Sequence, residues 1–285
     1  MHSPKSLFKY LPPDRADFLS SGLLRFTPLG AFNDPFDGRP HISALAPEQE
    51  LLSAIDESIR NSISLAFDRL PPETRKIVGL ADVELLAGST LALQRQSIYQ
   101  RCVHLLPSIV NIVHEKADAT VGALCLSEVP DNLLMWAHYA ASHTGFVVEF
   151  DGHHKYFNSA FTATDKFRHI RRVLYRDARP RGNLSSLLGE MFTVKSSHWA
   201  YEREWRILQP LPDASKVIDA SPFPIHLFPL PFDSIASIVF GARMTSQARN
   251  ELSERVRRNS LLAHITLRQA VPDDAHFLLR IEKAA

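Results

Sequence analysis

The pattern that most constrains the fold of this chain is a long block of helical periodicity inside a sequence of short apolar runs. Within residues 47–118, apolar side chains recur at spacings of three and four, and Pro71-Pro72 divides the block into several helical segments. On both sides, short apolar runs separated by turn-forming residues predict strands, without regular βαβ units. This mixture predicts an α+β fold with a compact β core. We expect one domain over residues 1–285, with a helical insertion at about residues 45–119.

The remaining elements are expected in a fixed order along the chain. The expected strands are residues 7–10, 23–27, 121–126, 145–150, 170–175, 202–208, 235–240 and 265–269, and the expected helices after the insertion are residues 130–141, 184–194 and 246–258. Thr245 or Ser246 is expected to cap the last of these helices, because a side-chain hydroxyl accepts from a free backbone N–H there.

The 11 glycines are spaced too widely for the common phosphate-binding loops. The closest pairs, such as Gly145 and Gly152, are seven positions apart. Neither the dinucleotide motif G-x-G-x-x-G nor the P-loop motif can be written anywhere in the sequence. Any ligand that carries phosphate must therefore be held in another way.

Charge and cysteine content limit the class of protein further. Lys and Arg total 32 and Asp and Glu total 31, so no dominant field for nucleic acid or membranes is expected. Two cysteines, Cys102 and Cys125, form neither a cysteine zinc site nor a disulfide framework. We expect a cytoplasmic protein with no signal peptide and no membrane span. No pattern indicates an oligomeric state.

The strongest candidate for chemistry is the segment around Glu202-Arg203-Glu204-Trp205-Arg206, with Lys195 shortly before it. If residues 202–208 form a strand, Glu202, Glu204 and Arg206 point to one face. One carboxylate can bind a ribose hydroxyl or stabilise an oxocarbenium ion, and a second can act as a base. The alternative is a surface ladder of charge pairs.

A second candidate is the aromatic and imidazole pattern on the expected helix 130–141. Trp136, Tyr139 and His143 recur on one helix face, with His138 to one side, and can stack a flat ring. The alternative is that this stripe packs into the core. His138 and His143 are five positions apart, a poor spacing for shared metal ligation, so no metal is predicted.

Two shorter motifs complete the candidate set. Asn33 and Asp34 precede a proline, which favours a turn, and the same loop can position polar groups at a site. Ser127 lies two residues after Cys125, at the end of an expected strand, and can bond a ligand or cap the next segment of the chain. Cys125 itself is interpreted as a buried strand cysteine rather than a nucleophile.

In order and combination, these motifs resemble the domain of unknown function 2971 family over about residues 7–243. The segments that carry the resemblance are Phe32–Asp37, Cys125–Glu128, Met135–Tyr139, His143–Phe146, and Lys195 with Trp199–Arg206, and Lys9-Tyr10 and Ile238–Gly241 fit the two ends.

The layout is also distantly similar to that of ADP-ribosyltransferases. Those enzymes have an early strand with a polar and aromatic pair, a middle strand with a serine motif and a late catalytic glutamate. Lys9-Tyr10, Ser127 and Glu202-x-Glu204 occupy these places, although Lys9 stands where those enzymes carry Arg or His.

This similarity implies an enzyme that uses NAD as its substrate and transfers ADP-ribose to nucleic acid or protein. It implies that Glu204 holds the ribose hydroxyl and stabilises the transition state, and that Glu202 assists the acceptor. The predicted catalytic residues are Glu204, Glu202 and His138, and the predicted binding residues are Tyr10, Asn33, Asp34, Ser127, Trp136, Tyr139, His143, Lys195 and Arg206.

Two other functions stay open at this point. The first is a nuclease or other hydrolase in a defence or toxin setting, which uses Asp34, His138, Glu149 and Lys195 without NAD. The second is a binding module without catalysis, in which the charged segment is structural.

Overall fold

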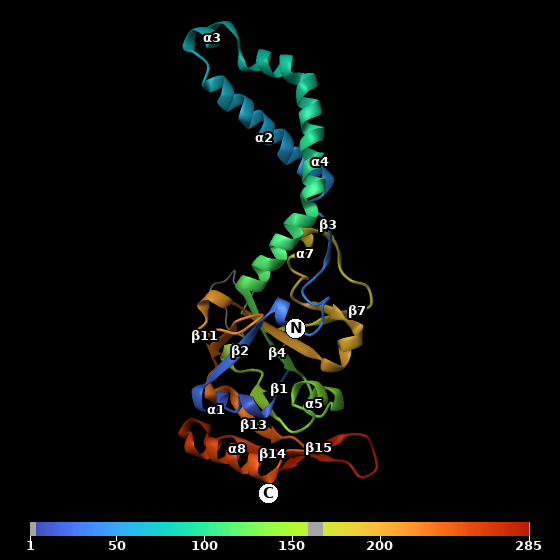
Figure 1. Cartoon of the computed structure of the whole chain (residues 1–285), viewed down its shortest axis with the longest axis vertical. Coiled ribbons are helices and arrows are strands. Elements are labelled where there is room, and N and C mark those ends of the chain that lie inside the picture. Colours follow the sequence, from blue (N-terminus) through green and yellow to red (C-terminus); the bar gives the residue numbers. More distant parts are fainter. Residues whose placement is uncertain (1–3, 159–167, 285) are drawn as a thin grey trace. The chain divides into compact units, whose positions relative to one another are not determined.

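The chain mixes helices with a large central sheet, which confirms the predicted α+β fold with a β core (Figure 1). A computed structural model describes residues 4–158 and 168–284. The chain divides into two compact units. The first comprises Met1–Gly38, Lys116–Arg179 and Thr193–Ala285, and the second comprises Arg39–Glu115 and Pro180–Phe192. The organisation as one domain with a helical insertion stays a prediction.

The main sheet of the first unit is almost entirely antiparallel. Among the described residues its strands follow the order β11, β12, β2, β4, β1, β5, β13, β14 and β15, with β10 against β4 and β6 against β10. Among the described strands of this sheet, only β13 and β14 pair in parallel, with α8 (Ser246–Arg258) between them in the chain. The strand bounds are β1 Ser6–Leu11, β2 Leu23–Pro28, β4 Val121–Ser127, β5 Phe146–Asp151, β6 Arg171–Arg172, β10 Glu204–Pro210, β11 Lys216–Ile218, β12 Ile225–Pro229, β13 Ile235–Phe240, β14 Thr266–Pro272 and β15 Leu279–Lys283.

Shorter elements connect these strands. The first unit also contains a parallel pair of short strands, β7 (Leu174–Arg176) and β9 (Val194–Ser196). Its short helices are α1 Phe18–Ser21, α5 Leu133–Tyr139 and α6 Lys155–Asn158, and its 3-10 helices are η1 Pro13–Arg15, η2 Leu29–Ala31, η3 Ser197–Glu202, η4 Leu211–Asp213, η5 Phe232–Ser234 and η6 Ser260–Leu262.

Strand β4 occupies a special place because its two edges are paired differently. One edge pairs with β10 along the whole of β4. On the other edge, within the described part of the chain, β2 pairs only with Gly122 and Ala123, and β1 pairs only with Ser127. The strands β1 and β2 therefore diverge beside the middle of β4. There the Lys9 ammonium donates to the carbonyl oxygen of Cys125 at 2.9 Å.

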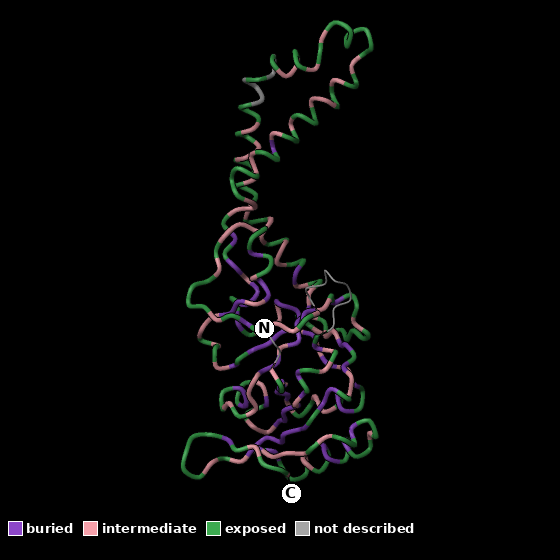
Figure 2. Tube along the Cα trace, turned by 180° about the vertical axis from the view of Figure 1, so that it is seen from behind, coloured by how far each residue is buried: buried purple, intermediate pink, exposed green. Residues whose placement is uncertain are grey.

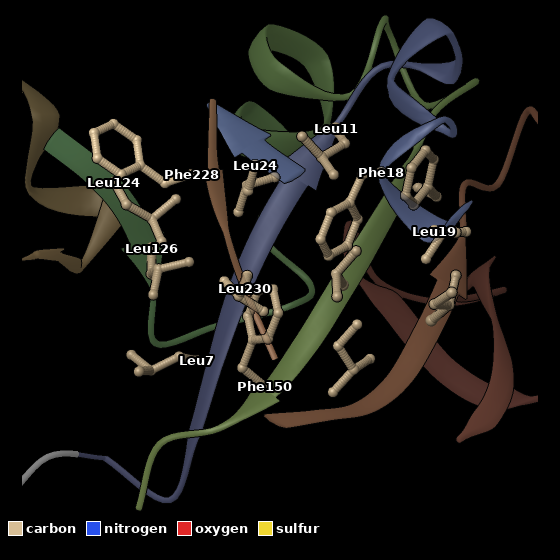
Figure 3. Packing of buried hydrophobic residues seen from close by; sticks show 14 of the residues in the cluster. Leu7, Leu11, Phe18, Leu19, Leu24, Leu124, Leu126, Phe150, Phe228 and Leu230 are labelled. Atoms are coloured by element: carbon tan, nitrogen blue, oxygen red, sulfur yellow. The ribbon is translucent and has the colours of Figure 1, made fainter. Parts of the chain in front are cut away.

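One face of the main sheet carries the larger apolar core (Figure 3). Alternate residues of the strands point into it, including Leu124 and Leu126 of β4 and Phe150 of β5. Leu252 and Val256 of α8 join the same cluster. Burying each such side chain contributes roughly 1.5–3 kcal/mol.

The predicted N-terminal cap of α8 is confirmed. The hydroxyl of Thr245 accepts from the N–H of Ala248 at 3.2 Å, at the first turn of the helix.

The other face of the sheet is covered by α5. The side chain of Asn132 caps this helix by accepting from two backbone N–H groups. Met135 and Trp136 of α5 then pack on Tyr10 and Val147 in a second apolar cluster. The rings of Trp136 and Tyr10 meet edge to face at 5.4 Å. The core interpretation of the aromatic stripe therefore holds for Trp136.

The second unit contains the predicted helical block. Its helices are α2 Glu48–Asp68, α3 Pro72–Ile77, the greater part of α4 Leu80–Thr120 and α7 Leu184–Leu187, and β3 His41–Ala44 pairs with β8 Arg181–Asn183. Arg95 of α4 bonds Asp56 of α2 at 2.7 Å. Most described residues of α2 and α4 are exposed or half-buried, whereas buried residues follow the strands of the first unit (Figure 2).

Two boundaries differ from those that the sequence pattern predicts. The pattern predicts a helix over residues 184–194, but α7 ends at Leu187 and β9 begins at Val194. The single strand predicted over residues 170–175 is two short strands, β6 and β7, because they pair with different partners, β10 and β9.

Candidate functional site

A cavity of about 270 Å³ lies in the first unit, beside the place where β1 and β2 diverge from β4. Its walls come from four strands of the main sheet together with β9, η3, α5 and the loop after η2. The lining residues are Phe8, Lys9, Tyr10, Arg25, Thr27, Ala31, Phe32, Asn33, Asp37, Cys125, Leu126, Ser127, Met135, Tyr139, Lys195, Glu202, Glu204 and Arg206.

Glu202 and Glu204 both reach this cavity, but not through the strand alternation that the sequence predicts. The expected strand 202–208 begins only at Glu204, and Glu202 is the last residue of η3. Arg203 between them has a φ of 45°, in the left-handed region. This backbone reversal brings the two carboxylates to one cation. From Glu204 onward the alternation holds, since Glu204 and Arg206 line the cavity while Trp205 packs into the core.

Lys195 of β9 is the cation that joins the carboxylates. Its ammonium lies 2.5 Å from Glu202, 3.1 Å from Glu204 and 3.7 Å from Asp37. It also lies 5.0 Å from the centre of the Trp199 ring, within range of a cation–π interaction. Its side chain is only 5% exposed. Burial alone would lower the pKa of Lys195, but Glu204 and Glu202 outweigh it and raise that pKa.

Arg206 of β10 is the second buried cation. Its guanidinium bonds both oxygens of Glu204, at 2.6 and 3.0 Å, and both oxygens of Asp37, at 2.8 and 2.5 Å. It lies 4.9 Å from the centre of the Phe32 ring. Asp37 stands at the end of a tight turn, and Gly38 after it has a φ of 68°, which glycine adopts without strain. The turn that begins at Asn33-Asp34 thus carries an anchor for Arg206.

The environments of the two glutamates push their pKa values in opposite directions. Burial would raise the pKa of Glu204, but Arg206 and Lys195 outweigh it and hold that pKa well below its usual range. Burial, with repulsion from Glu204, raises the pKa of Glu202 although Lys195 opposes the rise. When the pKa values of two neighbouring carboxyl groups differ in this way, one group commonly stays charged while the other carries a proton.

One negative charge of this network is unbalanced when all five groups are ionised. Three carboxylates, from Asp37, Glu202 and Glu204, face two cations, Lys195 and Arg206. All five side chains are at least 95% buried. Because so little solvent reaches them, the excess charge acts strongly on a group that lies against Glu202 and Glu204 in the cavity.

Tyr139 connects the loop after η2 to this network. Its hydroxyl donates to Glu202 at 2.6 Å and accepts from the Asn33 side chain at 3.1 Å. The pKa of Tyr139 is raised by burial and by the neighbouring Glu202, so the hydroxyl keeps its proton. Tyr139 and Asn33 therefore lie at the cavity, together with the carboxylate network.

Ser127 and Tyr10 line the cavity but use their hydroxyls on the backbone. Ser127 donates to the carbonyl oxygen of Glu202 at 2.7 Å, and Tyr10 donates to that of Val129 at 2.8 Å. The Ser127 bond ties the end of β4 to the end of η3 and helps place Glu202. Burial raises the pKa of the Cys125 thiol, which argues against a thiolate nucleophile.

Four predicted site residues do not line the cavity. His138 is exposed, and Trp136 is fully buried in the core with its Nε1 donating to the Pro130 carbonyl. His143 lies beyond the end of α5 in a left-handed conformation, where its ring stacks on Trp136 at 6.2 Å. Asp34 accepts from the N–H of Phe36, in agreement with the turn interpretation of its motif.

Asp37 and Arg25 line the cavity but were not among the predicted site residues. Asp37 lies inside the Phe32–Asp37 motif, but its pairing with Arg206 spans 169 positions and leaves no local signal. Arg25 does leave one, because it is a charged residue between Leu24 and Phe26 in an apolar strand. An arginine at such a position needs a polar environment on one face of the strand.

The described residues contain neither a candidate metal site nor a membrane-spanning helix. Within residues 4–158 and 168–284, no three His, Cys, Asp or Glu side chains are grouped to hold a metal ion. The helices of the same residues include none with both the length and the apolar character needed to cross a bilayer.

One family model matches a segment of this chain. The family model described as "Protein of unknown function (DUF2971)" matches residues 135–207, which confirms the predicted resemblance to this family over that segment. The matched segment contains most of α5, Lys195, Glu202, Glu204 and Arg206, whereas Asp37 and Ser127 lie outside it. No curated protein and no solved structure matches the chain.

Proposed function

We propose that this protein cleaves the bond between nicotinamide and ribose in NAD and transfers ADP-ribose to a nucleic acid or protein acceptor. The observation that carries the proposal is the buried excess of negative charge beside a cavity. Cleavage of this bond gives the ribose an oxocarbenium-like positive charge, which a preorganised negative site stabilises.

The two glutamates divide the chemical work. Glu204, kept ionised by Arg206 and Lys195, stabilises the positive charge that develops on the ribose. The bond between the ribose carbon and the nicotinamide nitrogen breaks, and its electron pair leaves with nicotinamide. An oxygen or nitrogen of the acceptor then bonds that carbon, and Glu202, with its raised pKa, takes the acceptor's proton. With water as acceptor, the product is free ADP-ribose.

The strand arrangement also supports the proposal. Lys9-Tyr10 lie on β1, Ser127 ends β4 and Glu204 begins β10, and these three strands are direct neighbours in the sheet. Ser127 stands opposite Phe8 on one side and opposite Glu204 on the other. The three motif positions of the distant resemblance therefore border one cavity.

The size of the cavity fits half of the dinucleotide. Its volume of about 270 Å³ lies just below the usual range for ligand pockets, which begins at about 300 Å³. We expect the nicotinamide, its ribose and the attached phosphate to enter it, with the adenosine half outside.

The geometry does not favour the hydrolase that the sequence left open. Of its four residues, only Lys195 lines the cavity. Glu149 instead accepts from Ser6 and Ser237 at another place on the sheet. Asp34 serves its own turn, and His138 is exposed.

The first test is binding and turnover of NAD by the wild-type protein. We expect calorimetry to detect NAD binding and the protein to release nicotinamide, faster when a nucleic acid or protein acceptor is present. Absence of binding at millimolar NAD would sink the proposal. Binding with no release of nicotinamide would instead favour a binding module without catalysis.

The pH dependence of turnover tests the role of Glu202. A base must be ionised, so the rate is expected to rise with pH through the pKa of Glu202, which lies above the usual value of about 4.3. The Tyr139 hydrogen bond favours the ionised form of Glu202, so Tyr139→Phe should move this acid limb to still higher pH. Tyr99→Phe in α4 is the matched control. An acid limb that stays in place in Tyr139→Phe would remove Glu202 from this role.

A further inference from the structure

Two cations of the cavity stand outside the carboxylate network: Lys9 on β1 and Arg25 on β2. Neither has an ion pair among the described residues, in contrast to Lys195 and Arg206. Lys9 donates to a neutral group, the carbonyl oxygen of Cys125. Burial and repulsion from Arg25 lower the pKa of Lys9, and attraction to Glu204 and Glu202 only partly opposes the fall.

Of the two cations, Arg25 has fewer of its hydrogen-bond donors paired with an acceptor. Its Nε atom is buried and has no hydrogen-bond partner among the described residues. Leu24 and Phe26 on either side are buried in the core, so strand alternation directs Arg25 to the other face, where it lines the cavity. Arg15 lies near enough to repel it as well. A half-buried guanidinium with like charges for neighbours is costly unless an anion joins it.

We propose that Lys9 and Arg25 form an anion subsite that binds a phosphate group of the ligand. A guanidinium binds phosphate through parallel N–H donors, and an ammonium adds a point charge. Thr27, two residues after Arg25 on β2, adds a hydroxyl to the same wall. The glycine spacing excludes the common phosphate-binding loops, and this subsite would hold phosphate without such a loop.

The source of the phosphate rests on the proposed function. If the cavity takes the nicotinamide half of NAD beside Glu202 and Glu204, the diphosphate follows the ribose and meets Lys9 and Arg25. The backbone phosphate of a nucleic acid acceptor offers the same chemistry. The cavity is thus divided into a negative part for the reacting ribose and a positive part for phosphate.

The test measures binding of inorganic pyrophosphate, NAD, nicotinamide riboside and a short single-stranded oligonucleotide by calorimetry. The variants are Arg25→Gln and Lys9→Gln, and the matched control is Arg255→Gln, at an exposed position of α8. We expect pyrophosphate and NAD to bind each cavity variant about 10- to 100-fold more weakly, the range for lost charge-assisted hydrogen bonds. Nicotinamide riboside, which has no phosphate, should bind Arg25→Gln as it binds wild type.

Each outcome separates the subsite from the proposed function. Pyrophosphate binding that depends on Arg25 supports the subsite even if NAD is not turned over, which would sink only the proposed function. An oligonucleotide weakened by Arg25→Gln while NAD is unaffected assigns the subsite to the acceptor. Pyrophosphate that fails to bind wild type, or that binds both cavity variants unchanged, overturns the subsite, and nicotinamide release by wild type would still uphold the proposed function.

Discussion

The Glu202→Gln variant is expected to release nicotinamide from NAD about 10²- to 10⁴-fold more slowly than wild type, the range for loss of a general base. Glutamine retains an oxygen that accepts from Tyr139 or Lys195, so the packing around it is preserved. It takes up no proton from the acceptor. The expected loss is in kcat, with NAD affinity close to wild type.

Three measurements separate this catalytic role from a structural one. The variant should lose the acid limb of the pH profile, keep its NAD dissociation constant and unfold in urea near the wild-type midpoint. Glu128→Gln is the matched control, since Glu128 accepts from Trp205 at 2.7 Å but does not line the cavity. A Glu202→Gln variant that turns NAD over at the wild-type rate would rule out the assigned base.

The Arg206→Met variant is expected to lower the free energy of unfolding by about 3–5 kcal/mol, the range for breaking a buried ion pair from one side. Arg206 is 1% exposed and bonds Glu204 and Asp37 with both sides of its guanidinium. Methionine fills part of its volume, but Asp37 then has only Lys195, at 3.7 Å, as a cation among the described residues. Two buried carboxylates lose their main partner at once.

Urea denaturation of both proteins at pH 7 measures this loss. Arg257→Met is the matched control, because its ion pair with Glu254 lies on the exposed side of α8 and is worth about 1 kcal/mol or less. Arg206→Lys keeps the charge but not the paired geometry, so it should fall between wild type and Arg206→Met. A loss below about 1 kcal/mol in Arg206→Met would contradict the interpretation of this network as a structural anchor.

The pH dependence of that loss depends on Glu204. Its pKa is lowered in the folded protein, so it contributes stability that is present above the usual pKa of about 4.3 and lost as pH falls through the lowered value. Arg206 is a main cause of the lowering. The stability difference between wild type and Arg206→Met should therefore shrink as the pH is lowered below about 4.

The local periodicity of apolar residues predicted many of the strands and helices. The strands β1, β2, β4, β5 and β13, and helices α2 and α8, lie close to where the pattern placed them, because each must turn one apolar face to a core. The helix predicted over residues 184–194 is wrong, because the buried apolar residues of this segment lie in a short helix, turns and a short strand rather than on one face of a single helix. Periodicity there indicated burial without indicating the element.

The candidate site was predictable in part. The alternation of Glu204, Trp205 and Arg206 is a property of the strand alone, and it placed two charged residues on one face. The position of Glu202 was not predictable, because it depends on the left-handed backbone at Arg203 and on the hydrogen bond that Ser127 donates to the Glu202 carbonyl. His138 and Tyr139 are adjacent in sequence, yet only Tyr139 meets the network.

By itself, the sequence determined which residues are buried together on each face, the absence of glycine-rich phosphate loops and the presence of charges inside apolar strands. Only the tertiary structure decided which charges pair: Asp37 with Arg206, and Lys195 with Glu202 and Glu204, while Lys9 and Arg25 have no carboxylate partner among the described residues. The physical reason is the distance along the chain over which each property is decided. Burial depends on the spacing of neighbours along the chain, whereas ion pairing depends on which distant strands become neighbours in the sheet.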